Sequence, residues 1–435
     1  MARIRQGTAT YNPPMTDSSR PVDCEILVAG AGVTGMAAAL GCAQAGYRTV
    51  LTGRDAQAAP PPATAEWDSR IYALSEGSKA LLERLGVWQA LDAARLQPVY
   101  DMRVYSKPGI GPGDRDELHF SAYKAARPTL AWIVEERNLV RALRTALGFA
   151  KLRRIDGEVG SLELDADPYH AELRTTDGRC MRARCILAAD GADSPLRSLA
   201  GLPVVERVYP QHAIVLNFDC ARSHRDTAWQ WFGEHGILAL LPLPPGDDPA
   251  WPGRCSIVWS APKLTAHAML EAGPEVIATE VGRISGSVLG ELLPIGSPRG
   301  FPLRCRISKP MIAPRLALMG DAAHVVHPLA GQGLNLGLGD VADWLDMLAN
   351  AGPAAQPGKG DPGAWLLLRR WARMRAEPVA AMRAVTDGLQ RIHDPEWIAS
   401  LGLAGRALDF VRGVGWRGVA RSGFLKHRLV ARAIG

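Results

Sequence analysis

The chain has 435 residues, of which 47% are hydrophobic, so it is long enough to bury a large core and to form two domains with an appendage. Its net charge is +6, and residues 401–435, with seven basic residues and one acid, carry all of it. Two classes are excluded, because the seven scattered cysteines have neither a disulfide-framework nor a zinc-finger pattern and no stretch approaches the roughly 18 to 20 apolar residues of a membrane span.

The first 20 residues are polar and contain arginines but no apolar core, so they are not typical of a secretory signal. We expect residues 1–20 to form a disordered leader. The odd number of cysteines fits reduced, mostly buried thiols in a cytoplasmic protein.

The first motif follows an apolar strand over residues 25–29 and consists of Gly30, Gly32 and Gly35. An alanine-rich helix follows and stops at Gly46. In this setting the first glycine permits a turn, the second lets a pyrophosphate approach the backbone, and the third packs helix on strand. The motif therefore predicts a bound dinucleotide.

The second strand, residues 48–53, departs from this pattern at its end. Gly53 stands where an acidic residue normally receives the adenosine ribose hydroxyls, and either Asp55 or a loop could take its place. The same glycine spacing recurs at residues 413–418, but no clear strand precedes it, so that copy is interpreted as part of a flexible basic tail.

A second set of strands lies between the motifs. A proline-rich loop over residues 58–70 leads to Arg70, and residues 102–123 are typical of a hairpin around a Gly-Pro turn. Further strands are predicted at residues 212–219, 237–243 and 255–260, and Trp229 and Trp231 are interpreted as sheet residues.

Residues 185–197 form another apolar strand that ends in Asp190 and Gly191, with Arg197 shortly after. An acid, a glycine and a basic residue at a strand end could reach a pyrophosphate or a nicotinamide cofactor. Alone, this segment is an ordinary end of a strand. It lies between the two glycine motifs, however, and three such strand-end motifs in this order are improbable by chance.

The most informative stretch is residues 315–335, where a strand over 316–319 ends in Gly320 and Asp321. The Asp321 carboxylate can accept hydrogen bonds from sugar-like hydroxyls, and Gly331 and Gly333 let backbone approach a planar ligand. A helix from about Leu334 offers free N–H groups and a positive dipole end, which suit an anionic reduced flavin. The alternative is a tight strand-to-helix connection without a ligand.

Two further alternatives concern charge and metal. Asp321, His324 and His327 have no further ligand cluster beside them, so no metal site is predicted.

A linker is predicted over residues 351–363, then a helix from near Trp365 with Pro378 marking a kink. The basic tail either binds an anionic membrane surface or is a solvated basic helix packed on the body or a partner.

Taken with these motifs, four segments carry a resemblance to a known family: residues 68–88, residues 134–143, residues 229–244 leading to 255–259, and residues 320–340. The chain resembles the FAD-dependent aromatic hydroxylases of the p-hydroxybenzoate hydroxylase fold, and more narrowly the ubiquinone-biosynthesis hydroxylases. Residues 373–389 are also similar to that group, so the likeness spans most of the chain.

The resemblance implies an α/β fold with a Rossmann-like FAD-binding domain, an inserted mixed β-sheet substrate domain and C-terminal helices. The FAD-binding domain is expected from residues 21–100, 130–205 and 308–350. The substrate domain is expected from residues 101–129 and 206–307, and residues 364–435 are expected to form the helical region with its basic tail.

The resemblance also implies a set of site residues. Gly30, Gly32 and Gly35 would hold the FAD pyrophosphate, Arg70 would lie near the flavin, and Asp190 would serve both FAD and the nicotinamide donor. The remaining contacts are expected from Gly320, Asp321, Pro328, Gly331, Gly333, Leu334 and Asn335.

Within this set, Asp321 would bind the ribityl hydroxyls, and Pro328 and Gly331 would lie at the reactive edge of the flavin. Glu136 occupies a position that is usually Asn, Gln or Arg in this fold, which leaves that ribityl contact open. No acid or base is assigned. Tyr209 and His212 are candidates by their location, although a lone histidine there is more often structural.

The implied function is hydroxylation of an aromatic ring of a polyprenyl phenol in ubiquinone biosynthesis through a flavin C4a-hydroperoxide. FAD would be reduced by NAD(P)H or a separate reductase, with O2 as co-substrate. The alternatives are a flavin hydroxylase of a small soluble aromatic and a non-catalytic flavin-bearing assembly protein. The expected partners are the aromatic substrate and either a peripheral inner-membrane surface or a quinone-biosynthesis complex, and not nucleic acid.

Overall fold

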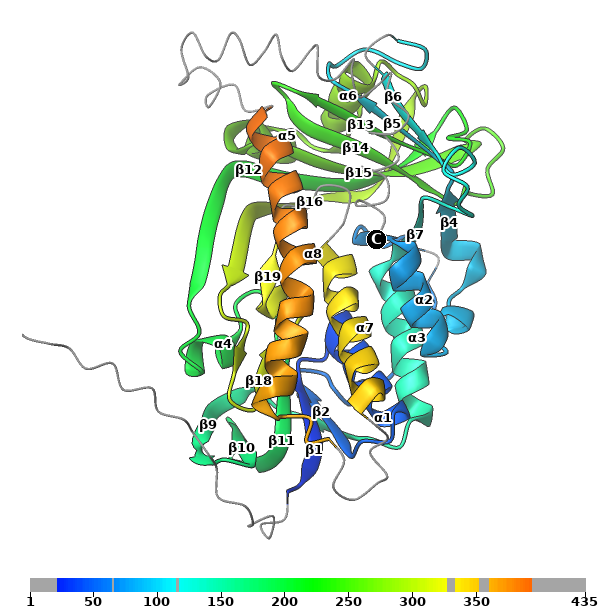
Figure 1. Ribbon diagram of the computed structural model, residues 1–435. Helices are drawn as coiled ribbons and strands as arrows, with labels where there is room; N and C mark the ends of the chain where they lie inside the picture. The colour runs from blue at the N-terminus through cyan, green and yellow to red at the C-terminus, as the bar shows by residue number, and fades with distance from the viewer. Residues whose placement is uncertain (1–21, 65, 115–116, 327–332, 352–359, 393–435) are drawn as a thin grey trace, which may run out of the picture.

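The computed structural model of the chain describes residues 22–64, 66–114, 117–326, 333–351 and 360–392 (Figure 1). Pro328, Gly331 and His327 lie outside the described residues, as do the expected leader, most of the expected linker and the basic tail. Within the described residues, no helix is both long and apolar enough to cross a membrane.

The first sheet is built around parallel strands from distant parts of the chain. Strand β1 (Cys24–Ala29) lies between β2 (Thr49–Gly53) and β11 (Cys180–Ala188), and β18 (Leu316–Leu318) pairs with β11. The outer strands are β8 (Arg153–Asp156), β9 (Val159–Asp167), β10 (His170–Thr175) and β17 (Ile312–Ala313). Because β1, β11 and β18 are parallel, the three predicted motifs leave the sheet at the same edge.

Helices cover this sheet, among them α1 (Val33–Gln44), α3 (Glu136–Phe149) and α7 (Gly333–Ala351) (Figure 1). Helix α1 packs against both α3 and α7. Helices α1 and α7 approach closely at Gly41, where a Cβ would lie 2.4 Å from Leu345 Cδ1 and would force that side chain to shift. Helix α2 (Glu76–Arg84) contacts α7, and the short α4 (Pro195–Leu199) follows the β11 loop.

The second sheet has eight strands in the order β19-β16-β12-β15-β14-β13-β5-β6. Their bounds are β5 (Asp101–Tyr105), β6 (Glu117–Ser121), β12 (Val204–Cys220), β13 (Thr227–Gly233), β14 (Gly236–Leu243), β15 (Gly253–Pro262), β16 (Leu292–Ser308) and β19 (His324–Val325). Strands β12 and β16 are long and antiparallel, and they run from this sheet toward the first one (Figure 1).

Two helices that the sequence analysis did not identify, α5 (Lys263–Ala272) and α6 (Pro274–Ser285), cover one face of this sheet. A small third sheet of β3 (Ile71–Leu74), β7 (Ala131–Glu135) and β4 (Leu96–Val99) faces its other side. Helix α8 (Trp365–Ile392) contains Pro378, and Val379 packs against the ribbon of β12 and β16.

The expected fold class is confirmed. The predicted strands at 212–219, 237–243 and 255–260 lie within β12, β14 and β15, and the predicted hairpin is the β5–β6 pair. The predicted division into domains stays a prediction, although β5, β6 and β12 to β16 do share one sheet.

Candidate active site

The three glycines after β1 have different steric roles. A Cβ on Gly30, whose φ is +117°, would lie 2.1 Å from Ala189 O, and a Cβ on Gly35 would lie 1.8 Å from Gly30 O. A Cβ on Gly32 would meet nothing within 4 Å. Gly30 and Gly35 are therefore required by packing, whereas Gly32 faces open space at the N-terminus of α1, which carries no side-chain cap. An uncapped helix N-terminus favours an anionic group such as a pyrophosphate.

The loop after β11 places Asp190 beside this glycine turn. Asp190 Oδ2 accepts a hydrogen bond from Leu196 N at 3.0 Å, and Oδ1 has no partner among the residues that the structure describes. Burial raises the pKa of Asp190, and hydrogen bonds, the first from Ser194, oppose the rise. Arg197 donates to the carbonyls of Ala192 and Ala322, both at 2.9 Å, so it joins this loop to the turn after β18.

The turn after β18 is fixed by a carboxylate that the sequence analysis missed. Gly320 has a φ of +57°, and its N–H donates to Asp340 Oδ2 at 2.8 Å. His324 Nε2 lies 2.8 Å from the same oxygen, and Arg375 Nε donates to Oδ1 at 2.6 Å. Burial opposes ionisation of Asp340, yet His324 and Arg375 hold its pKa below the usual value. The sequence offered little to single it out, because Asp340 is one of three acids in the helix after the motif, with Asp343 and Asp346.

The Asp321 side chain is exposed to solvent, and neighbouring protein atoms partly desolvate its carboxylate. The desolvation raises the pKa of Asp321, and the charges of His324 and Arg70 oppose the rise. The Arg70 side chain is 69% exposed, and its Nη1 lies 3.1 Å from Glu136 Oε2. Tyr72 donates to Glu136 Oε1 at 3.1 Å. The unusual Glu136 is thus the partner of Arg70, and the charge of Arg70 acts on Asp321.

The start of α7 is locked to the strand β3 by Asn335. Its Oδ1 accepts hydrogen bonds from Ser75 N at 2.9 Å and Ser78 Oγ at 2.7 Å, and its Nδ2 donates to Ala73 O at 2.8 Å. The side chain of Asn335 is therefore fully used within the protein. A Cβ on Gly333 would meet nothing within 4 Å, and Leu334 is half-buried, so backbone there stays approachable.

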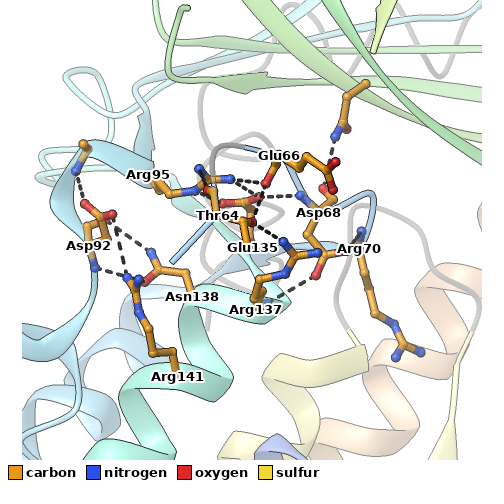
Figure 2. Close-up of polar contacts among 12 residues, drawn as sticks. Thr64, Glu66, Asp68, Arg70, Asp92, Arg95, Glu135, Arg137, Asn138 and Arg141 are labelled. Atoms are coloured by element: carbon orange, nitrogen blue, oxygen red, sulfur yellow. Dashed lines mark hydrogen bonds and ion pairs between the residues drawn. The ribbon is translucent and has the colours of Figure 1, made fainter. Parts of the chain in front are cut away.

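The segment before Arg70 is held by a buried ion pair (Figure 2). Glu135 is 2% exposed, and Arg95 bonds it through Nε at 2.5 Å and Nη2 at 2.8 Å. Glu135 also accepts from Asp68 N, while Arg95 donates to Thr64 O at 2.9 Å. Because Arg70 follows Asp68 by two residues, this pair sets its position. The sequence signal was a glutamate at the end of an apolar strand.

Of the two candidate bases, only Tyr209 is seen to pack beside the described ends of the predicted flavin loop. Tyr209 is buried with Val326 and Leu336, and the Arg207 guanidinium lies 5.2 Å from its ring centre. His212 Nδ1 lies 3.2 Å from His267 Nε2, and burial and the charge of His267 lower the pKa of His212. Neither residue is assigned a role in proton transfer, so both stay predictions.

These features fit FAD. The uncapped helix N-terminus at Gly32 suits the pyrophosphate, the accessible Asp321 carboxylate suits the ribityl hydroxyls, and Gly333 leaves backbone open to a planar ring. Among the described residues, no group of three or more His, Cys, Asp or Glu side chains could hold a metal ion.

Comparison with known proteins gives one family. The family described as FAD binding domain matches residues 23–358. Ubiquinone hydroxylase UbiL of Rhodospirillum rubrum is 34% identical, with 99% of this chain and 95% of that protein covered. The 3-demethoxyubiquinol 3-hydroxylase of Escherichia coli is 31% identical, with 94% of this chain and 98% of that protein covered.

Solved structures agree on the fold. The p-nitrophenol 4-monooxygenase PnpA of Pseudomonas putida superposes with a TM-score of 0.69 at 16% identity, covering 94% of this chain and 96% of that one. HpxO of Klebsiella pneumoniae, complexed with FAD and uric acid, gives 0.68 at 17% identity, with 94% and 96% covered. The resemblance is confirmed, and the chain belongs to the FAD binding domain family, as one of its FAD-dependent hydroxylases related to those of ubiquinone biosynthesis.

Proposed function

We propose that this protein hydroxylates the aromatic ring of a polyprenyl phenol in ubiquinone biosynthesis, with FAD as cofactor and O2 as co-substrate. Electrons come from NAD(P)H or a separate reductase. The full-length relatives are named as ubiquinone-pathway hydroxylases, so neither a small soluble aromatic nor a non-catalytic assembly role is favoured.

The observation that carries this proposal is that, among the residues that the structure describes, the buried side chains of the eight-stranded sheet that face the third sheet are uncharged. We call this side the inner face. Its buried side chains on β12 to β15 are Ala213, Val215, Asn217, Ala228, Gln230, Phe232, Ile237, Ala239, Leu241, Leu243, Ser256 and Ser260. None of them is charged, and Arg254 at the margin pairs with Asp219 at 2.7 Å. A neutral, apolar substrate suits such a surface, whereas an aromatic carboxylate would need a free cation.

The site residues have the following proposed roles. Gly32 and the α1 N-terminus bind the pyrophosphate, with Gly30 and Gly35 shaping the turn, and Asp190 lies beside it. Gly320 and Asp321 hold the ribityl chain, and Arg70 lies on the flavin side. Gly333, Leu334 and Asn335 present backbone to the ring, with Pro328 and Gly331 at its reactive edge.

When bound and reduced, FAD supplies the activation of O2 and the transfer of one oxygen atom. The chain's own contribution is to orient the phenol ring and to exclude water from it. The apolar cluster of Ile71, Ala73, Ile133, Leu241 and Leu243 between the two sheets serves the second role.

A polyprenyl substrate resides in a membrane, so we also propose that the protein meets it at the inner-membrane surface. The seven basic residues of the 401–435 segment, interleaved with apolar ones, support this proposal. Co-sedimentation with vesicles that contain anionic lipid is expected and should disappear with neutral vesicles. Equal binding to both would contradict it.

One experiment tests the catalytic proposal without knowing the electron donor. The FAD-loaded protein is reduced chemically without air and then mixed with 18O2 and a farnesylated phenol, and the products are analysed by mass spectrometry. The expected product is a phenol that carries one 18O atom. Hydrogen peroxide with unmodified phenol, at saturating phenol and across ring-substituted homologues, would contradict the proposal.

A further inference from the structure

The two faces of the eight-stranded sheet differ in what covers them. The outer face, which carries Trp229, Trp231 and Ile257, is packed under α5 and α6. Side chains alternate along a strand, so Gln230, between the two tryptophans on β13, lies on the inner face. The polar Gln230 therefore lies on a face whose buried residues are otherwise mostly apolar.

The carboxamide of Gln230 makes no hydrogen bond with the residues that the structure describes, and although the residue is only 5% exposed, its nitrogen and oxygen are not among the fully buried unpaired atoms, so the amide can be reached from outside. Buried amides are nearly always bonded, and an unmade bond costs stability. Its neighbours in the sheet register are Ala239 and Val104, and Ala228 lies two residues before it. None of these three side chains carries a polar atom that could bond the amide.

The surroundings of Gln230 connect it to the flavin site. Ala228, on the same face, packs in one cluster with Ala73, whose carbonyl accepts the bond from Asn335 at the start of α7. Ala213, also on the inner face, packs with Val326, the last described residue before the predicted flavin loop. The described ends of that loop thus both border the face that carries Gln230.

We infer that the Gln230 carboxamide binds an oxygen substituent of the substrate's aromatic ring and thereby orients the ring toward the flavin. This inference rests on the proposed function and deepens it by naming the residue that recognises the ring. A neutral amide can accept a hydrogen bond from a phenol hydroxyl or donate one to a ring carbonyl or methoxy oxygen. It does so without placing a charge on an apolar face.

The test compares two ligands and two variants of the FAD-loaded protein. Farnesylphenol and farnesylbenzene differ only in the ring oxygen, and their dissociation constants follow from the change in flavin absorbance. Gln230→Met removes the amide at nearly constant shape, and Gln230→Ala provides a second variant. Gln97→Met is the matched control, because Gln97 is 6% exposed but its amide donates to Asp226 Oδ1 and Pro98 O.

The wild-type protein is expected to bind farnesylphenol about tenfold more tightly than farnesylbenzene, the value of one net hydrogen bond. Gln230→Met and Gln230→Ala should bind both ligands alike and release more hydrogen peroxide per hydroxylated product. Gln230→Met should keep its melting temperature, because it loses no partner. Gln97→Met should lose melting temperature and keep the tenfold preference.

Two results would overturn the inference. One is a tenfold preference that persists in both Gln230 variants, and the other is a wild-type protein without any preference for the ring oxygen. Either could occur while 18O is still inserted into the phenol, so a failure of the inference is distinct from a failure of the proposed function.

Discussion

The buried carboxylate of Asp340 gives the sharpest prediction on how the flavin turn is held. Asp340 is fully buried and accepts from Gly320 N and Arg375 Nε, with His324 Nε2 at hydrogen-bond distance. Asp340→Asn keeps the shape but leaves the Arg375 cation without its main counter-charge. Removing one partner of a buried ion pair costs about 3 to 5 kcal/mol, and we expect the lower end, because Arg375 also bonds Asp343.

The matched control is Asp343→Asn on the same helix. Asp343 Oδ2 accepts from the same arginine at 2.8 Å, but its side chain is 31% exposed and Gly320 bonds Asp340 instead. We expect a loss of at most about 1 kcal/mol there. In Asp340→Asn the Gly320 N–H also loses a charged acceptor, so the adjacent Asp321 shifts and FAD binding weakens about tenfold.

Urea unfolding at saturating FAD, followed by tryptophan fluorescence, gives the stability, and a separate titration gives the FAD dissociation constant. The stability that Asp340 contributes should also depend on pH. Because the folded pKa of Asp340 is lowered, its contribution is present above the unfolded value of roughly 4 and is lost as the pH falls further. If Asp340→Asn unfolded at the same urea concentration as Asp343→Asn and bound FAD normally, the reasoning would be wrong.

The remaining predictions concern the other motif residues. Asp321→Ala should lower FAD content and activity together while the fold persists, because its carboxylate is accessible, and an unchanged FAD content would refute the ribityl assignment. Gly32→Ala should fold normally and weaken FAD binding, whereas Gly35→Ala should unfold more easily, as denaturant midpoints and FAD titrations would reveal. Asn335→Ala should lower the free energy of unfolding in urea by about 2 to 3 kcal/mol, since it leaves the Ala73 carbonyl and two donors unpaired. A loss smaller than that expected for one solvent-exposed hydrogen bond would contradict this role of Asn335.

The sequence predicted the features that depend on local pattern. Glycine spacing after an apolar strand identified the turn in which Gly30 and Gly35 leave no room for a Cβ. The order of the three strand-end motifs and the family resemblance predicted one site, and the parallel strands β1, β11 and β18 do bring these motifs to one edge.

Partners that depend on tertiary contacts were not predictable. Asn335 bonds Ser75, 260 residues away, and no local period indicates such a pair. Arg197 was considered for a cofactor phosphate, yet its guanidinium is 6% exposed and bonds backbone carbonyls. A charged side chain near a motif can serve the ligand or the fold, and only burial and partners distinguish the two.

The position of Asp68 connects the two halves of the site. Its backbone N–H donates to Glu135, which the Arg95 ion pair fixes on the third sheet, and its carbonyl accepts from Asn217 Nδ2 at 3.1 Å on the inner face. One peptide segment is thus bonded to both the eight-stranded sheet and the third sheet, two residues before Arg70. A shift of the inner face would therefore strain the single bond from Asn217, while the buried Glu135 pair would keep Arg70 in place.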